Sequence, residues 1–186
     1  MGKTLALLIL FMAGTTSALN AQAAPAARGG TGSIYAGGTY SFFKSGNPES
    51  TSPNQYTNWL QGIGGYFDFN YTDMFGVEGE VRFLRFNQMN SVHEDTYSIG
   101  PKITYRHRKY EPYGKVLFGV GEINFPYSFA HGGYFAMAFG GGLDYRVTPR
   151  LKLRVIDYEY QYWPGFLNHS LQPNGFSVGA SYRIFK

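Results

Sequence analysis

The chain has 186 residues, with 16 lysines and arginines against 12 acidic residues, and it contains no cysteine. This length suits one domain, and a net charge of +4 without a clustered basic face does not indicate a nucleic-acid partner. The absence of cysteine excludes disulfides, thiolate metal sites and cysteine catalysis. Aromatic residues make up 18% of the chain and leucine and isoleucine are sparse, which suggests that apolar surface is needed outside a conventional core.

The first 23 residues have the three-part layout of a secretory signal peptide. A basic Lys3 precedes an apolar run over residues 5–13, and Ala21, Gln22 and Ala23 form an A-x-A cleavage site. The run is too short to cross a bilayer, which needs roughly 20 residues, and the alternative is a buried N-terminal helix. We expect cleavage after Ala23 and a flexible lead-in over residues 24–32, followed by one domain over 33–186.

From Ser33 onward the dominant period of the sequence is two, which is the period of a β-strand. In residues 75–86, for example, Phe75 and Val81 alternate with Glu78 and Glu80. The pattern predicts eight strands, over residues 33–43, 59–69, 75–86, 96–106, 113–121, 134–147, 151–163 and 176–185.

The predicted connections alternate in length. Those after the second, fourth and sixth strands are short, whereas longer loops follow the first, third, fifth and seventh, at 44–58, 87–95, 122–133 and 163–174. Short turns on one rim and long loops on the other are typical of outer-membrane barrels, where the short turns are periplasmic. We therefore predict an all-β fold, an eight-stranded antiparallel up-and-down transmembrane barrel with both termini on the periplasmic side.

The distribution of side chains indicates which face of the sheet points inward. A soluble sandwich would bury the apolar face, whereas a membrane barrel turns it to lipid and keeps polar residues inside. The signal peptide, aromatic residues near strand ends and the mixed signs of the charged face favour the barrel. The charged residues predicted to form ion pairs inside it are Glu78, Glu80, Arg82, Lys102, Lys115, Asp144, Arg146, Arg154, Asp157 and Glu159.

The alternation breaks within residues 151–163. Regular pairing that turns Arg154 inward would turn Asp157 outward into lipid. We predict a β-bulge at Val155 and Ile156, because one extra residue restores the phase and brings Asp157 near Arg154. The outer aromatic girdle is then predicted to contain Tyr158, Tyr160, Tyr162 and Trp163.

The last predicted strand carries the most specific motif, and from it the chain resembles the small eight-stranded outer-membrane proteins of the OmpA/OmpX type over about residues 33–185. The resemblance implies a C-terminal signal read by the barrel-assembly machinery, after escort by periplasmic chaperones. One departure is that Lys186 follows the final aromatic residue. The residues matched to the signal are Ser177, Gly179, Tyr182, Ile184 and Phe185.

Catalytic motifs are weak. The four histidines fall in predicted loops or turns, and none lies in a metal-binding spacing. Lipid A deacylases use a His-x-Ser arrangement, but His169 and Ser170 are adjacent and would point to opposite sides of a strand. We therefore expect no enzyme activity, cofactor or metal, with a lipid-modifying activity as the remote alternative.

We expect the protein to lie in the outer membrane of a diderm bacterium and to have a structural or interaction role. The interior of eight strands is just wide enough for side chains, so ion pairs are expected to plug it; a small ion or water channel is the alternative. We expect a monomer in contact with outer-membrane lipids and lipopolysaccharide. The candidate loop contacts are Tyr56, Phe125, Tyr127, Phe129, Phe166 and Leu167.

Overall fold

The computed structural model describes residues 32–44, 59–86, 93–124, 131–166 and 169–185. The predicted signal peptide, all but the last residue of the lead-in, and the candidate contacts Tyr56, Phe125, Tyr127, Phe129 and Leu167 lie outside these residues. No helix among the described residues is long and apolar enough to cross a membrane.

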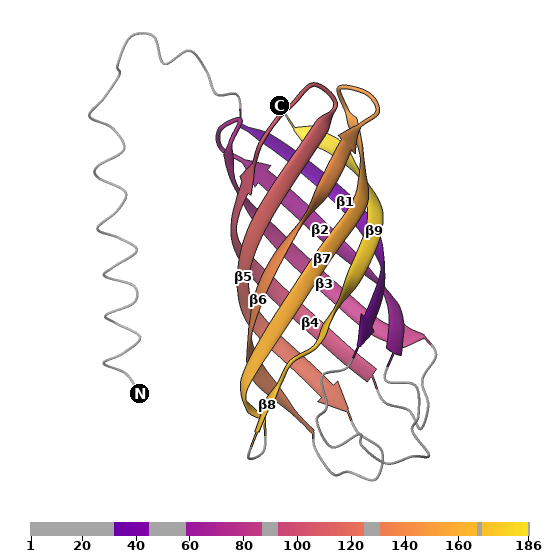
Figure 1. Ribbon diagram of the computed structural model, residues 1–186, viewed down its shortest axis with the longest axis vertical. Helices are drawn as coiled ribbons and strands as arrows, with labels where there is room; N and C mark the ends of the chain where they lie inside the picture. The colour runs from indigo at the N-terminus through magenta and orange to yellow at the C-terminus, as the bar shows by residue number, and fades with distance from the viewer. Residues whose placement is uncertain (1–31, 45–58, 87–92, 125–130, 167–168, 186) are drawn as a thin grey trace, which may run out of the picture. The chain divides into compact units, whose positions relative to one another are not determined.

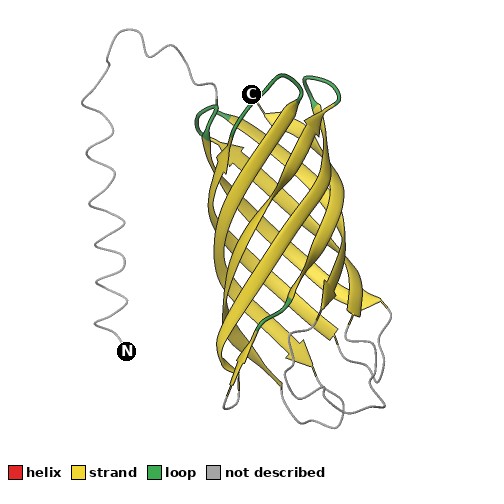
Figure 2. Cartoon of the chain, viewed as in Figure 1, coloured by secondary structure: helices red, strands yellow, loops and turns green. Residues whose placement is uncertain are grey.

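Nine strands make up the regular structure of the described residues (Figures 1 and 2). Eight of them are long, and β8 is a three-residue strand in the predicted last loop. Their bounds are β1 Ser33–Lys44, β2 Trp59–Asn70, β3 Phe75–Phe86, β4 His93–Thr104, β5 Tyr110–Asn124, β6 His131–Arg146, β7 Leu151–Phe166, β8 His169–Leu171 and β9 Asn174–Phe185.

The eight long strands close into a barrel. Consecutive strands from β1 to β7 pair antiparallel, β7 pairs with β9, and β9 pairs with β1 to complete the ring. This confirms the predicted up-and-down topology. Closure satisfies the backbone of every strand and removes free sheet edges, which is the condition for a sheet to lie in lipid.

The three short turns, over residues 71–74, 105–109 and 147–150, lie at the end of the barrel where the last strand finishes (Figure 1). We call this the turn end and the opposite end the loop end. Strands β5, β6 and β7 are 15 or 16 residues long and the other long strands have 12. The regular pairing of these three strands extends beyond the 9 to 14 residues predicted for them.

The two faces of the wall differ in polarity as the alternation predicts. On β3, Phe75, Val77 and Val81 are exposed on the outside, and Glu78 and Glu80 are buried inside. The other strands repeat this pattern, so the outer surface is a continuous apolar band rich in aromatic and β-branched residues. Such a surface suits contact with acyl chains.

The bulge predicted in β7 is confirmed by the register on both sides of the strand. Against β9, Arg154 pairs with Gly179 and Asp157 pairs with Ser177, so Val155 and Ile156 together face one residue. Both apolar residues lie outside, at 49% and 44% exposed, and Asp157 is buried. The extra residue therefore keeps charged side chains inside along the whole strand.

The predicted outer aromatic girdle is wrong for Trp163. Tyr158 and Tyr162 are exposed on the outside, but Trp163 is fully buried inside the barrel against Ile123 and Leu171. It continues the inward alternation of β7 after the bulge, so its position in the strand, rather than the usual preference of tryptophan for membrane interfaces, decides its direction. A β-carbon on Gly121 would lie 2.2 Å from its ring, so this site needs glycine.

Candidate functional site

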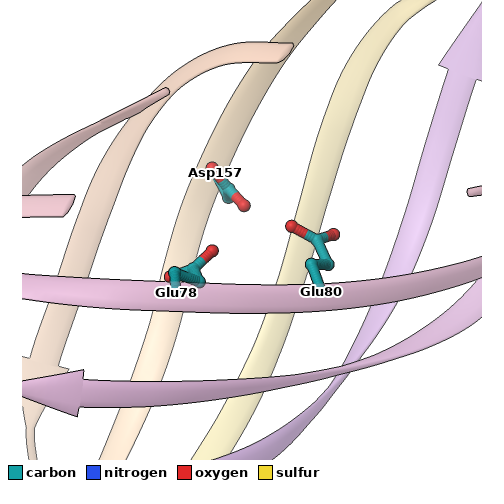
Figure 3. A group of neighbouring side chains, drawn as sticks. All are labelled: Glu78, Glu80 and Asp157. Carbon is teal, nitrogen blue, oxygen red and sulfur yellow. The ribbon is translucent and has the colours of Figure 1, made fainter. Parts of the chain in front are cut away.

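The centre of the interior is a group of carboxylates around one ammonium. Glu78 and Glu80 on β3 and Asp157 on β7 point toward one another (Figure 3), and their oxygens lie within 4.8 Å of one another. Lys115 of β5 donates hydrogen bonds to all three, at 2.9, 2.8 and 2.7 Å respectively. The ammonium therefore provides the positive charge that a metal ion would supply to such a triad.

Arg154 joins both sides of this centre. Its two terminal nitrogens donate to the two oxygens of Glu78 at 3.1 and 2.7 Å, which is the bidentate geometry that makes such pairs strong. It also donates to Asp144 at 3.3 Å and to Asp157 at 3.4 Å, and it lies 3.9 Å from Asp68. The guanidinium lies over the ring of Tyr66, 3.7 Å from the centroid, so packing also fixes its position.

Lys102 and Arg82 extend the group in opposite directions along the barrel. Lys102 donates to Asp68 at 3.0 Å and to Glu78 at 2.8 Å. Arg82 pairs with Glu80 and, at 2.9 Å, with Glu159. We call the ten connected residues the central network: Asp68, Glu78, Glu80, Arg82, Lys102, Lys115, Asp144, Arg154, Asp157 and Glu159.

The charge of the central network is nearly balanced. Six carboxylates face four cations, so the formal charge is −2 when every group is ionised. All ten side chains are buried. Burying ions is expensive unless each has close partners, and here every cation has at least two carboxylates within 4 Å.

A smaller group of ions lies toward the turn end. Glu111 of β5 is fully buried and pairs with Arg146 and, at 2.6 Å, with Lys152. Arg106 lies 3.6 Å from the same carboxylate. The ammonium of Lys152 lies over the ring of Tyr35, 4.0 Å from the centroid. Three cations around one acid make this end positive.

The loop end of the interior is apolar. Phe43, Leu60 and Leu84 form one cluster, and Trp163 belongs to another. The full second cluster is Ile123, Ala136, Trp163 and Leu171. We call the two clusters together the apolar cover. Hydrogen bonds from Trp163 to Gln161 and from Gln161 to Glu159, at 2.8 and 2.7 Å, connect it to the central network.

Glu94 is an exception within this cover. It is fully buried, and its neighbours in register on β3 and β5 are Leu84 and Ile123. Neither of its carboxylate oxygens has a hydrogen-bond partner among the described residues. Burial of a carboxyl group without polar partners is costly, and no ion pair within the described part of the chain offsets that cost, so the fold holds Glu94 in place.

The structure brings nine of the ten predicted interior residues together in the central network. The tenth, Arg146, lies in the smaller group around Glu111. Sequence reasoning did not select Asp68, Glu94, Glu111 or Lys152 as interior ion-pair residues. Asp68 and Lys152 carried a usable signal because both fall on the polar side of an alternating strand, whereas Glu111 was assigned to a turn and Glu94 to a loop.

The predicted assembly signal occupies β9, the strand that closes the ring with β1. Tyr182, Ile184 and Phe185 are exposed on the outside. Ser177 is buried, and its hydroxyl lies 2.8 Å from that of Ser41 on β1. Gly179 pairs in register with Thr39 of β1.

The remaining predicted residues lie at the two ends of the barrel. Phe166 is the last residue of β7, and its backbone pairs with His169 of β8. Ser170 is the middle residue of β8. His93 is the first residue of β4 and His131 the first of β6, whereas His107 is at the turn end, bridged to Tyr110. The described histidines are therefore distributed over both ends.

Comparison with known proteins agrees with this architecture. Residues 6–183 match the family described as outer membrane protein beta-barrel domain. No curated protein matches the chain.

Similar solved structures include Neisserial surface protein A, which is 15% identical with a TM-score of 0.57, over 80% of this chain and 96% of that one. The N-terminal β-barrel domain of OprF from Pseudomonas aeruginosa is 13% identical with a TM-score of 0.54, over 82% and 99%. Ail of Yersinia pestis, crystallised with a heparin analogue, is 20% identical with a TM-score of 0.50, over 83% and 99%. At identities this low, the similarity shows a shared fold and nothing more.

Proposed function

Because the chain belongs to the outer membrane protein beta-barrel family, we propose that it is a structural and interaction barrel of the outer membrane whose interior does not conduct ions. The observation that carries the proposal is the filling of the interior. The central network crosses the barrel through contacts such as Lys115 to Asp157 and Arg154 to Glu78, and the apolar cover lies beyond it at the loop end.

The width of the barrel supports this proposal. Eight strands leave an interior that side chains can fill, and here arginine, glutamate and tryptophan side chains occupy it with no exposure to solvent or almost none. The wall also carries a hollow of about 590 Å³, but residues on its outer, lipid-facing side, such as Phe67, Val81 and Phe118, line it. That hollow does not offer a path through the interior.

We place the binding of partners at the loop end and the contact with lipids on the outer wall. The predicted loops emerge there, and loops on a rigid scaffold are where binding usually resides. The outer apolar band fits outer-membrane lipids and lipopolysaccharide acyl chains. The exposed end of β9 is proposed as the part read by the barrel-assembly machinery after export. The closed ring leaves no strand edge for pairing with a second copy, which supports a monomer.

Planar-bilayer recording tests the proposal. Purified wild-type barrel is expected to give no stable single-channel steps, and the neutral variants Glu80→Gln and Arg154→Gln are compared with it. Lys44→Gln is the matched control, because Lys44 is exposed at the loop end and lies outside the central network. Stable wild-type steps whose size changes in the two interior variants, but not in the control, would show that the interior conducts.

A narrow cation path is the second candidate function. The excess of carboxylates over cations in the central network favours it, since a negative interior attracts cations. The reversal potential in a potassium chloride gradient distinguishes this candidate: a cation-selective potential that weakens in Glu80→Gln supports it, and electrical silence does not.

We propose no catalytic role for His169 and Ser170. They are consecutive residues of β8, whereas the His-x-Ser arrangement of lipid A deacylases separates the two by one residue. Mass spectrometry of lipid A and phospholipids from cells with and without the protein tests this. A mass change on expression that disappears in His169→Ala would establish an enzyme instead.

A further inference from the structure

Basic residues gather at the turn end of the barrel. Among the described residues, six lysines and arginines lie in the short turns, directly beside them or near the end of β9. The acidic residues of the same region are Asp73 and the buried Glu111. We call the six residues the basic rim: Arg106, Arg108, Lys109, Arg146, Arg150 and Arg183.

Backbone hydrogen bonds join these turns into one continuous arc. The amide of Thr104 donates to Met74 at 2.8 Å, connecting the turn before β3 to the end of β4. The amide of Arg146 donates to Lys109 at 2.8 Å, and that of Arg183 donates to Arg150 at 2.7 Å. These hydrogen bonds fix the backbone positions of the basic rim relative to one another, so its charges form one continuous surface.

Half of the basic rim is exposed and has no counter-ion. Arg108, Lys109 and Arg150 are exposed, and within the described residues none of them forms an ion pair. Arg106 and Arg146 are instead engaged with Asp73 and Glu111. The uncompensated charges therefore point away from the barrel, where a negatively charged partner can reach them.

The backbone of the β4–β5 turn places two of these cations at its tip. His107 and Tyr110 are hydrogen-bonded to each other in both directions, at 2.9 Å, so Arg108 and Lys109 form a two-residue turn. Arg108 has a φ of 55°, in the left-handed region that asparagine and glycine adopt most easily. An arginine here costs local stability relative to glycine or asparagine, and it places a positive charge at the tip of the turn.

Exposed aromatic residues surround the barrel next to the basic rim. Tyr71, Tyr105 and Tyr110 adjoin the short turns, and Phe185 ends β9. Tyrosine in such a belt lies at the level of lipid headgroups, with its ring toward the acyl chains and its hydroxyl toward water. The basic rim therefore lies at the depth where lipid phosphates are found.

We propose that the basic rim binds the phosphate groups of anionic phospholipids in the leaflet that the short turns face. In barrels of this kind that leaflet is the periplasmic one. Arginine matches phosphate with two parallel hydrogen bonds, and clustered cations beside a membrane attract anionic lipids. The rim thus fixes the depth and lipid surroundings of the barrel, which is separate from any role of the loops or interior.

Reconstitution in mixed lipid vesicles tests this. The full-length mature barrel is placed in vesicles of phosphatidylcholine with phosphatidylglycerol, and the lipids retained after gentle extraction are measured by native mass spectrometry. Wild-type protein is expected to retain phosphatidylglycerol in preference to phosphatidylcholine, and less so in high salt. Neutralising Arg108, Lys109 and Arg150 to glutamine is expected to lower this preference by about fivefold for each charge removed.

Three controls make the result specific. Arg108→Lys with Arg150→Lys keeps the charge and is expected to keep most of the preference. Lys44→Gln removes an exposed charge at the loop end and is expected to leave it unchanged. A heat-modifiable gel shift shows that each variant folds, and Arg150→Gln alone replaces the triple variant if that one does not fold.

Two outcomes overturn the proposal. One is equal retention of both lipids by wild-type protein. The other is binding of a soluble polyanion such as heparin to the wild-type rim in detergent, lost in the triple variant, without any lipid preference in vesicles. That second outcome would assign the rim to a polymer in the periplasm.

Discussion

Glu78 and Glu94 are both fully buried glutamates inside the same barrel, but their surroundings are opposite. In the central network, Glu78 has Lys102, Lys115 and Arg154 within 2.9 Å. In the apolar cover, Glu94 lies between Leu84 and Ile123 in the register, and neither oxygen has a hydrogen-bond partner in the part of the chain that the structure describes. One residue type therefore occurs in two environments within the interior of one barrel.

The comparison shows that the two parts of the interior are stabilised differently. In the central network each ion depends on several partners, so removal of one leaves the others buried and uncompensated. In the apolar cover the stabilising contribution comes from packing, and a buried polar group without partners opposes it. Substitutions of similar size should consequently have opposite effects on stability in the two regions.

The largest effect is expected from Arg154→Met in the central network. The change leaves Glu78, Asp144 and Asp157 without their guanidinium partner, and such losses cost about 3–5 kcal/mol of unfolding free energy. Urea unfolding in lipid vesicles, followed by tryptophan fluorescence, measures this. The control is Val155→Met on the outer face, expected to change stability by less than about 0.5 kcal/mol. A similar small change for Arg154→Met would contradict the dependence on partners.

Lys115→Met should cost about 3 kcal/mol, part of which calcium should restore. The substitution removes the ammonium from Glu78, Glu80 and Asp157, whose oxygens are close enough together to hold a metal ion. Oxygen ligands of this kind suit calcium. Refolding with and without millimolar calcium, followed by the same unfolding assay, measures the recovery.

Lys102→Met is the matched control for calcium rescue. Its carboxylate partners are Asp68, Glu78 and Asp144, and these three do not form a close triad of the kind found around Lys115 within the described residues. We expect it to be destabilised without recovery in calcium. Equal recovery in both variants would mean that calcium acts on the membrane surface instead of at the triad.

Trp163→Ala tests the apolar cover and should cost about 3 kcal/mol. It removes the largest side chain of the cluster and the hydrogen bond to Gln161. Trp59→Ala is the control, because Trp59 is exposed on the outer face near the same end. The two variants are compared by their urea midpoints on heat-modifiable gels. A larger effect for Trp59 would mean that contacts with lipid, rather than packing of the cover, dominate at this end.

The alternation of the sequence was sufficient to predict the barrel and the inward direction of most charges. Glu78 and Glu80 follow directly from the period of two, and the change of phase before Asp157 predicted the bulge that the register confirms. Trp163 was assigned wrongly because a general preference of tryptophan for interfaces was given more weight than its position in the strand. Local periodicity was the better guide.

Partners across the interior could not be predicted in the same way. Glu78 on β3 contacts Arg154 on β7, and these strands are not neighbours in the sheet. Alternation indicates which face a residue occupies but not its height along the barrel, which depends on strand tilt and register stagger. For the same reason Arg146 was grouped with the central network, although it lies nearer the turn end, beside Glu111.

The smallest change, and the only gain, is expected from Glu94→Met. An apolar side chain of similar length can pack beside Leu84 and Ile123. It removes a buried carboxyl group that lacks hydrogen bonds to the described residues, so stability should rise by about 1–3 kcal/mol. Glu78→Met is the matched comparison, with the same chemical change at the same burial, and it should destabilise because three cations lose their partner. Urea unfolding of both variants in the same vesicles measures the two signs. A loss of stability in both would show that Glu94 has a compensating partner, and the interior would then be ionic throughout its length.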